Sequence, residues 1–115
     1  MRSLAAGLAV GIAFSLTIGT RAVAQTPEAA AVYRQHCKTC HGATGTPTQR
    51  MLGLYPKLKT LVDSTLMAGL SVDSIVNLIR TGRGDMKPLG GKLTADQMTA
   101  VAQYVKGIPA AAHKP

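Results

Sequence analysis

The chain has 115 residues and is strongly basic, with 13 lysines and arginines against five acidic residues and a formal net charge of +8. This length allows one small domain, and three tyrosines and one phenylalanine offer few aromatic side chains for a core. The basic residues are scattered and no nucleic-acid-binding motif accompanies them, which argues against nucleic acid as a partner.

The first 24 residues predict a secretory signal peptide. Arg2 supplies the positive start, residues 4–18 are almost wholly apolar, and Ala22-Val23-Ala24 has the A-x-A form of a cleavage site. The apolar run is short for a membrane span, which needs about 20 residues. We therefore expect cleavage and a periplasmic domain over 25–115, with an uncleaved N-terminal anchor as the alternative. The mature domain would keep 11 basic residues against five acids.

A helix is predicted after Thr26, its N-cap, and leads into Cys37-Lys38-Thr39-Cys40-His41. C-x-x-C-H is the pattern of c-type haem attachment. Each thiol can form a thioether with one of two neighbouring vinyl groups, and the next residue is carried under the iron. We therefore predict one haem c bound through Cys37 and Cys40, with His41 as the proximal iron ligand.

Other uses of the two cysteines fit less well. A zinc site would need two further ligands at workable spacing, which His36 and His113 do not supply. A thioredoxin-like redox pair needs a βαβ context, and no strand-like alternation is present. A plain disulfide between Cys37 and Cys40 remains the alternative for an exported protein.

The rest of the chain reads as further helices joined by long loops. Glycines and Pro47 predict a loop over 42–47, and apolar spacing predicts a helix over 58–70. Ser71 is the expected N-cap of the next helix, which should end at the Gly82-Arg83-Gly84 cluster.

The last helix has the clearest start. Thr94 and Gln97 match a capping box, and a buried stripe follows at Met98, Val101, Ala102 and Val105. Gly107 predicts the end of this helix, with a disordered tail after Ile108. The predicted fold class is all-α, with about four helices around the cofactor.

The iron also needs a ligand on its second face. The candidates are Met51, Met67, Met86, Met98, His36 and His113. Two of the methionines, Met67 and Met98, lie in apolar helical stretches and are better explained by core packing. Of the histidines, one lies too close to the attachment motif and the other lies in the tail.

Met51 and Met86 are both expected in loops. We favour Met86, because glycines on both sides let the chain approach the porphyrin and Pro88 stiffens the segment. Met51 is the reserve candidate. Ligation by a histidine and a methionine raises the reduction potential and closes the iron to outside ligands, which suits electron transfer.

These motifs, in this order, resemble class I c-type cytochromes, particularly small bacterial ones. The resemblance covers nearly all of 25–107 and is carried by segments 37–42, 55–58, 86–94 and 101–105. It implies the cytochrome c fold, electron transfer without catalysis, and iron ligation by His41 and Met86. It also implies that the Pro56 carbonyl accepts the proximal imidazole N–H.

The resemblance further implies that Tyr33 and Tyr104 pack where the N- and C-terminal helices cross, with Ala29 at the small-residue position. Lysines should border the haem, and we expect them to steer acidic redox partners toward it: Lys38, Lys57, Lys59, Lys87 and Lys92.

Three functions are consistent with the sequence. The leading one is a soluble, monomeric, single-haem electron carrier of the periplasm. The second is a permanent cytochrome subunit of a dehydrogenase or other oxidoreductase complex. A haem enzyme or ligand sensor is less favoured, because no histidine or carboxylate is placed to act as a distal acid–base group.

Overall fold

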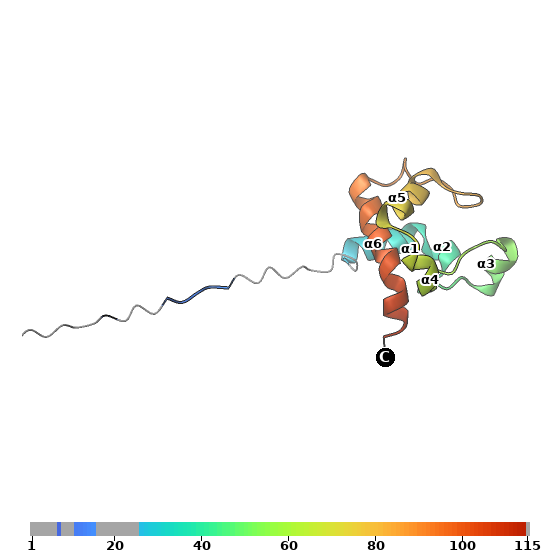
Figure 1. Ribbon diagram of the computed structural model, residues 1–115. Coiled ribbons are helices and arrows are strands. Elements are labelled where there is room, and N and C mark those ends of the chain that lie inside the picture. The colour runs from blue at the N-terminus through green and yellow to red at the C-terminus, as the bar shows by residue number, and fades with distance from the viewer. Residues whose placement is uncertain (1–6, 8–10, 16–25, 115) are drawn as a thin grey trace, which may run out of the picture.

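The computed structural model describes residues 7, 11–15 and 26–114. Most of the predicted signal peptide over 1–24 therefore falls outside the described residues. Within them the fold is all-α, as predicted, and Figure 1 shows its six helices. Their bounds are α1 Pro27–His36, α2 Lys38–His41, α3 Gln49–Leu54, α4 Ser64–Ala68, α5 Val72–Thr81 and α6 Ala95–Ala112.

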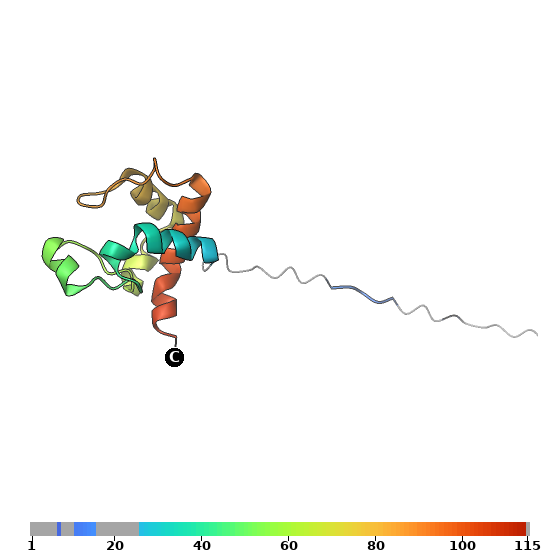
Figure 2. The ribbon, with the colours of Figure 1, turned by 180° about the vertical axis from the view of Figure 1, so that it is seen from behind.

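Helix α6 is the centre of the packing. Helices α1, α4 and α5 all lie against it, as the two opposite views agree (Figures 1 and 2). Val101 and Ala102 in its middle are fully buried. Met98 and Val105 are buried on the same stripe, which confirms the predicted core face of this helix.

Three predicted helix starts are confirmed by their capping bonds. The Thr26 hydroxyl accepts from the Ala29 N–H at 3.2 Å. The Ser71 hydroxyl accepts from Ser74 at 3.0 Å, and α5 then ends at Thr81, before the glycine cluster. Thr94 and Gln97 form both bonds of the capping box. Each bond satisfies an N–H that the first helical turn leaves without a backbone partner.

The crossing of α1 and α6 also forms as the resemblance implied. Helices α1 and α6 are in contact, and Ala29 of α1 is fully buried. The rings of Tyr33 and Tyr104 are also in contact, with centroids 5.2 Å apart and planes tilted by 38°. Such tilted aromatic contacts are favourable beyond the area they bury.

The helix predicted over 58–70 is shorter than expected. The Leu61 N–H and the Thr60 hydroxyl both donate to the Gly45 carbonyl, at 2.7 and 3.2 Å, which ties this non-helical stretch to the preceding loop. The helix starts only after Asp63, whose carboxylate caps the Leu66 N–H at 3.0 Å. A tertiary contact, which the spacing of apolar residues cannot predict, therefore replaces the first turns of the expected helix.

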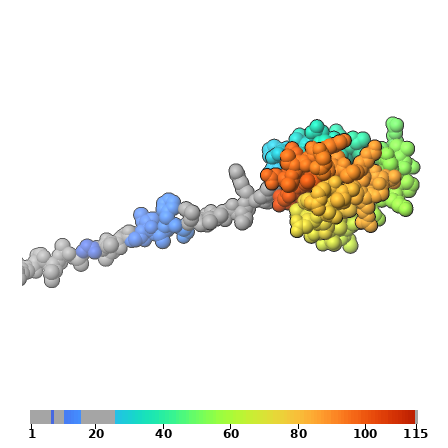
Figure 3. All heavy atoms as spheres, turned by 90° about the horizontal axis from the view of Figure 1, so that it is seen from above, coloured from blue at the N-terminus to red at the C-terminus, as the bar shows by residue number. Residues whose placement is uncertain are grey.

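The prediction that Met51 lies in a loop was wrong, because this residue lies in α3. Thr48 caps the helix by accepting from the Met51 N–H at 3.3 Å. Helix α3 lies at the edge of the globular part, where Leu54 is 60% exposed (Figure 3). Together with the four-residue α2, it raises the number of helices above the predicted four.

The end of α6 was also predicted wrongly. The helix passes Gly107 and Pro109 and continues to Ala112, so residues 109–112 are helical rather than a loose tail. Ile108 and Pro109 are buried, and their packing compensates for the backbone hydrogen bond that proline cannot donate. His113 follows as the C-cap, with its Nδ1 2.7 Å from the Pro109 carbonyl.

Among the helices of the described residues, none has both the length and the hydropathy that a membrane span requires.

Candidate haem site

The attachment motif occupies a sharp junction between two helices. Cys37 ends α1 and begins α2, and its N–H donates to the Tyr33 carbonyl at 2.9 Å. The short helix that follows brings the His41 N–H within 2.9 Å of the Cys37 carbonyl. Cys37, Cys40 and His41 are all half-buried, and the two thiols are not joined to each other.

The chain after the motif can turn only because residue 42 is glycine. Gly42 has φ +81°, and a Cβ on it would lie 1.9 Å from the Thr46 carbonyl oxygen. Its own carbonyl accepts from the Tyr33 hydroxyl at 2.7 Å. The motif is therefore held at both ends by α1, through the backbone at Cys37 and through the tyrosine side chain at Gly42.

The imidazole of His41 is held by a backbone carbonyl. Its Nδ1 lies 3.3 Å from the carbonyl oxygen of Lys59, not from that of Pro56. Pro56 lies three residues earlier, in an exposed turn, so the role implied for its carbonyl stays a prediction. No residue type marks a carbonyl as an acceptor, so the sequence could not have identified Lys59.

This contact fixes which nitrogen of His41 is free. A carbonyl oxygen only accepts, so the proton must be on Nδ1 and the lone pair on Nε2, the atom that can bind a metal. Burial lowers the pKa of His41, while the Lys59 carbonyl opposes this shift. The neutral, ligating form of the imidazole is favoured as a result.

The pKa of the Cys37 thiol bears on the redox-pair alternative. Burial, together with the neighbouring Cys40, raises its pKa to about 11. A thioredoxin-like pair requires the opposite shift, toward a reactive thiolate at neutral pH. This raised pKa gives no support to the redox-pair alternative.

Met86 lies on a tight turn beyond α5. Its N–H donates to the Arg83 carbonyl at 3.0 Å, and its own carbonyl accepts from the Arg83 N–H at 2.9 Å. Gly82 makes the approach possible, since it has φ +72° and a Cβ there would lie 2.5 Å from the Met86 oxygen. The Met86 side chain is half-buried and packs against the core.

The far end of this loop is tied back to the same helix. The Leu89 N–H donates to the Ile79 carbonyl at 2.8 Å, and the Gly90 N–H donates to the Arg80 carbonyl at 3.2 Å. We call residues 82–91 the Met86 loop. Because both of its ends bind the last turn of α5, the position of Met86 is set by that helix.

The other sixth-ligand candidates lie elsewhere. Met67 and Met98 are 4% and 6% exposed and belong to the core, as predicted. Met51 lies on peripheral α3 and His36 ends α1. His113 is occupied by the Pro109 carbonyl.

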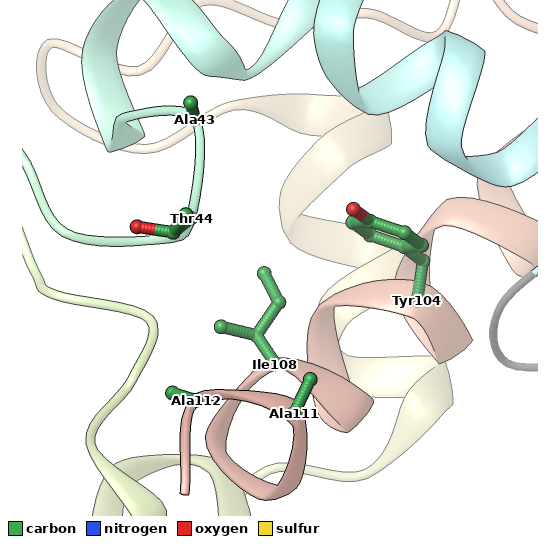
Figure 4. A pocket seen from close by; sticks show the side chains of 6 residues that line it. All are labelled: Ala43, Thr44, Tyr104, Ile108, Ala111 and Ala112. Atoms are coloured by element: carbon green, nitrogen blue, oxygen red, sulfur yellow. The ribbon is translucent and has the colours of Figure 1, made fainter. Parts of the chain in front are cut away.

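A haem requires an apolar wall, and the structure provides half-buried apolar side chains that pack on the core and still reach solvent. This set includes Cys37 and Met86 together with Val62, Leu66, Leu70, Val72, Val76 and Leu89. A small cavity of about 190 Å³ lies elsewhere, between α6 and the loop after the motif (Figure 4). Its lining residues, among them Thr44, Tyr104 and Ile108, include none of the predicted haem-binding residues, and it is too small for a tetrapyrrole.

Known proteins are similar to this chain. A family model described as "Cytochrome C oxidase, cbb3-type, subunit III" matches residues 24–105. The chain is 31% identical over 76 residues to cytochrome c6 of Euglena gracilis, covering 64% of this chain and 82% of that protein. It is 29% identical over 75 residues to cytochrome c6 of Chlorolobion braunii, covering 65% and 81%.

A solved structure agrees with these relatives. The KustC0563 c-type cytochrome is 34% identical, with a TM-score of 0.63, over 70% of this chain and 95% of that chain. The chain belongs to the c-type cytochrome family. Membership implies a covalently bound haem c, for which the two cysteines have the required spacing, and it makes the protein a single-haem electron-transfer cytochrome with redox proteins as partners.

The five lysines predicted to border the haem are all exposed: Lys38, Lys57, Lys59, Lys87 and Lys92. Three of them are next to site residues. Lys38 lies inside the motif, Lys59 supplies the carbonyl for His41, and Lys87 follows Met86.

Proposed function

We propose that this cytochrome is a soluble electron carrier of the periplasm, with the iron bound by His41 on one face and by Met86 on the other. The observation that supports the first ligand is the Nδ1 contact to Lys59, which leaves Nε2 free for a metal. The second is supported by the turn that presents Met86, closed by two backbone bonds and tied to α5 at both ends.

Each residue then has a distinct task. Cys37, at the end of α1, and Cys40, within α2, would hold the porphyrin through thioethers. The Lys59 carbonyl orients the imidazole ring of His41. When bound, the haem supplies a one-electron iron couple. The thioether of Met86 favours the ferrous ion and excludes water and other small ligands.

The exposed lysines give the site a positive rim. Scattered cations on a solvated surface would do little, but three of these five adjoin site residues. We propose that they steer an acidic partner toward the haem edge, as charge complementarity raises the rate of encounter. The association rate should fall as ionic strength rises, and Lys87→Gln should weaken this dependence more than Lys114→Gln.

A permanent subunit of a larger complex is the second candidate. The matching family model bears the name of an oxidase subunit, which favours this alternative. Purification from the native host distinguishes the two. A carrier elutes alone, whereas a subunit co-purifies with a catalytic chain at constant stoichiometry.

The proposal is tested on secreted holoprotein with three measurements on one sample. Intact mass should equal the chain from residue 25 plus one haem, and a pyridine haemochrome spectrum should report thioether-linked haem. The reduced protein should be low-spin and bind carbon monoxide poorly. A high-spin iron that binds carbon monoxide readily would contradict closure by Met86, and retention of residues 1–24 would contradict the soluble form.

A further inference from the structure

Lys106 makes an unusual contact for a lysine of a basic protein. It lies on α6, half-buried, and its ammonium reaches across to α4. Its Nζ donates to the Met67 carbonyl at 2.9 Å and also to the Leu70 carbonyl. The lysines of the predicted haem rim, by contrast, are exposed to water.

This contact holds the end of a short helix. The two carbonyls are those of the last turn of α4 and of the residue two positions beyond it. Cations with N–H donors stabilise helix C-termini, because the carbonyls there point outward and carry partial negative charge. Removing an ammonium from water is costly unless it is hydrogen-bonded. Replacing a half-buried lysine bonded in this way should therefore affect stability more than replacing an exposed surface lysine.

The contact lies at the junction between α4 and α5. Leu70 directly precedes Ser71, the N-cap of α5. The opposite end of α5 carries the Met86 loop, through the bonds from Leu89 and Gly90 to its last turn. Lys106 thus fixes the start of the helix whose end presents Met86. Both opposite views show α4 and α5 lying against α6, the helix from which Lys106 projects (Figures 1 and 2).

We propose that Lys106 is a positioning residue for the haem site. By binding the α4–α5 junction, it fixes the register of α5 against α6 and thereby the position of the Met86 loop. This inference rests on the proposed ligation by Met86. Its immediate consequence is that loss of the ammonium loosens residues 64–72 first and then weakens closure of the iron.

Three variants of the holoprotein test this role. Lys106→Met keeps a similar length and apolar stem without the donors, whereas Lys106→Arg keeps a charged donor group. Lys114→Met is the matched control, since it removes the same charge from an exposed position just beyond the end of the same helix. The readouts are amide hydrogen exchange, the weak red absorption band of ferric iron bound to a thioether, and the rate of carbon monoxide binding to the ferrous form.

We expect about tenfold faster exchange or more over 64–72 in Lys106→Met, because hydrogen bonds from a charged group are among the stronger ones. Exchange in α1 should stay unchanged, which shows that the fold is intact. The thioether band should weaken and carbon monoxide binding should accelerate. Lys106→Arg should restore both in part, and Lys114→Met should match the wild type.

Two results would overturn the proposal. Unchanged hydrogen exchange over 64–72 in Lys106→Met would mean that the contact does not stabilise this segment. Faster exchange with an unchanged band and an unchanged carbon monoxide rate would mean that Lys106 stabilises α4 without positioning Met86. A wild-type protein that lacks the band would instead contradict ligation by Met86, and the exchange measurement would still decide whether Lys106 holds the junction.

Discussion

The crossing of α1 with α6 and the Met86 loop are built from different interactions. At the crossing, Ala29 and Val101 are fully buried and two tyrosine rings are in contact. In the loop, Met86 is only half-buried, and its place depends on backbone hydrogen bonds and on glycine at position 82. The packed half should therefore determine whether the chain folds, and the loop half should determine what the iron does.

The largest loss of stability is expected where the motif joins the packed half. Gly42→Ala should destabilise the holoprotein by roughly 3 kcal/mol or more, because an alanine at φ +81° is strained and its Cβ would meet the Thr46 oxygen at 1.9 Å. Chemical unfolding measures this loss. Gly53→Ala is the control, since a Cβ at that position meets nothing within 4 Å, and equal losses in the two variants would contradict the account.

The corresponding change in the loop half should separate stability from ligation. Gly82→Ala places a Cβ 2.5 Å from the Met86 oxygen at φ +72°, and should cost roughly 2 kcal/mol. It should also weaken the ferric thioether band, because Met86 must shift. Gly91→Ala, where a Cβ meets nothing within 4 Å, should leave the band unchanged. An intact band in Gly82→Ala would show that the loop does not set the ligand.

A truncation in the packed half should show the opposite pattern. Val101→Ala removes methyl groups at a fully buried position and should cost about 2 kcal/mol, from lost burial and the cavity left behind. The reduction potential and the thioether band should not change, because Val101 makes none of the backbone hydrogen bonds that hold the Met86 loop. A shifted potential at unchanged haem content would mean that the two halves are not separable.

The smallest expected effect concerns Tyr33, which joins the packed half to the haem-attachment motif. Tyr33→Phe loses the bond to the Gly42 carbonyl and should cost about 1 kcal/mol. Burial raises the pKa of Tyr33 from 10.0 to about 12, so the folded state retains this proton more tightly than the unfolded chain does. Stability from this group is complete below pH 10 and is lost as pH rises toward 12.

Unfolding at alkaline pH tests this predicted change of stability with pH. Between pH 10 and 12, the wild type should lose more stability than Tyr33→Phe does. Tyr104→Phe serves as the control, as this ring packs against Tyr33 from α6. Parallel curves for the wild type and Tyr33→Phe would mean that the hydroxyl does not couple to folding.

The sequence predicted those features whose signals are local. The helix start at Thr26, the capping box at Thr94 and the apolar stripe of α6 each depend on residues within one or two turns, and all three appear where expected. The helix over 58–70 was predicted too long, because its first half is held by the Gly45 carbonyl from another part of the chain.

The haem site shows the same limit of prediction from sequence. The contact of His41 runs to a backbone carbonyl at Lys59, and the bonds of Lys106 run to carbonyls 36 and 39 residues away. Carbonyls are present at every position, so only the tertiary arrangement selects them. Side-chain identity could place Met86 among the candidates, whereas the backbone bonds that hold its loop became visible only in the folded chain.

The central claim is that the loop half presents Met86 to the iron while the packed half holds the fold. The reduction potential of Met86→Ala holoprotein, measured beside Met51→Ala, tests it most directly. Loss of the thioether should lower the potential of Met86→Ala by on the order of 0.1 V with little change in stability, and Met51→Ala should match the wild type. An unchanged potential in Met86→Ala, or a fall in Met51→Ala instead, would contradict this account.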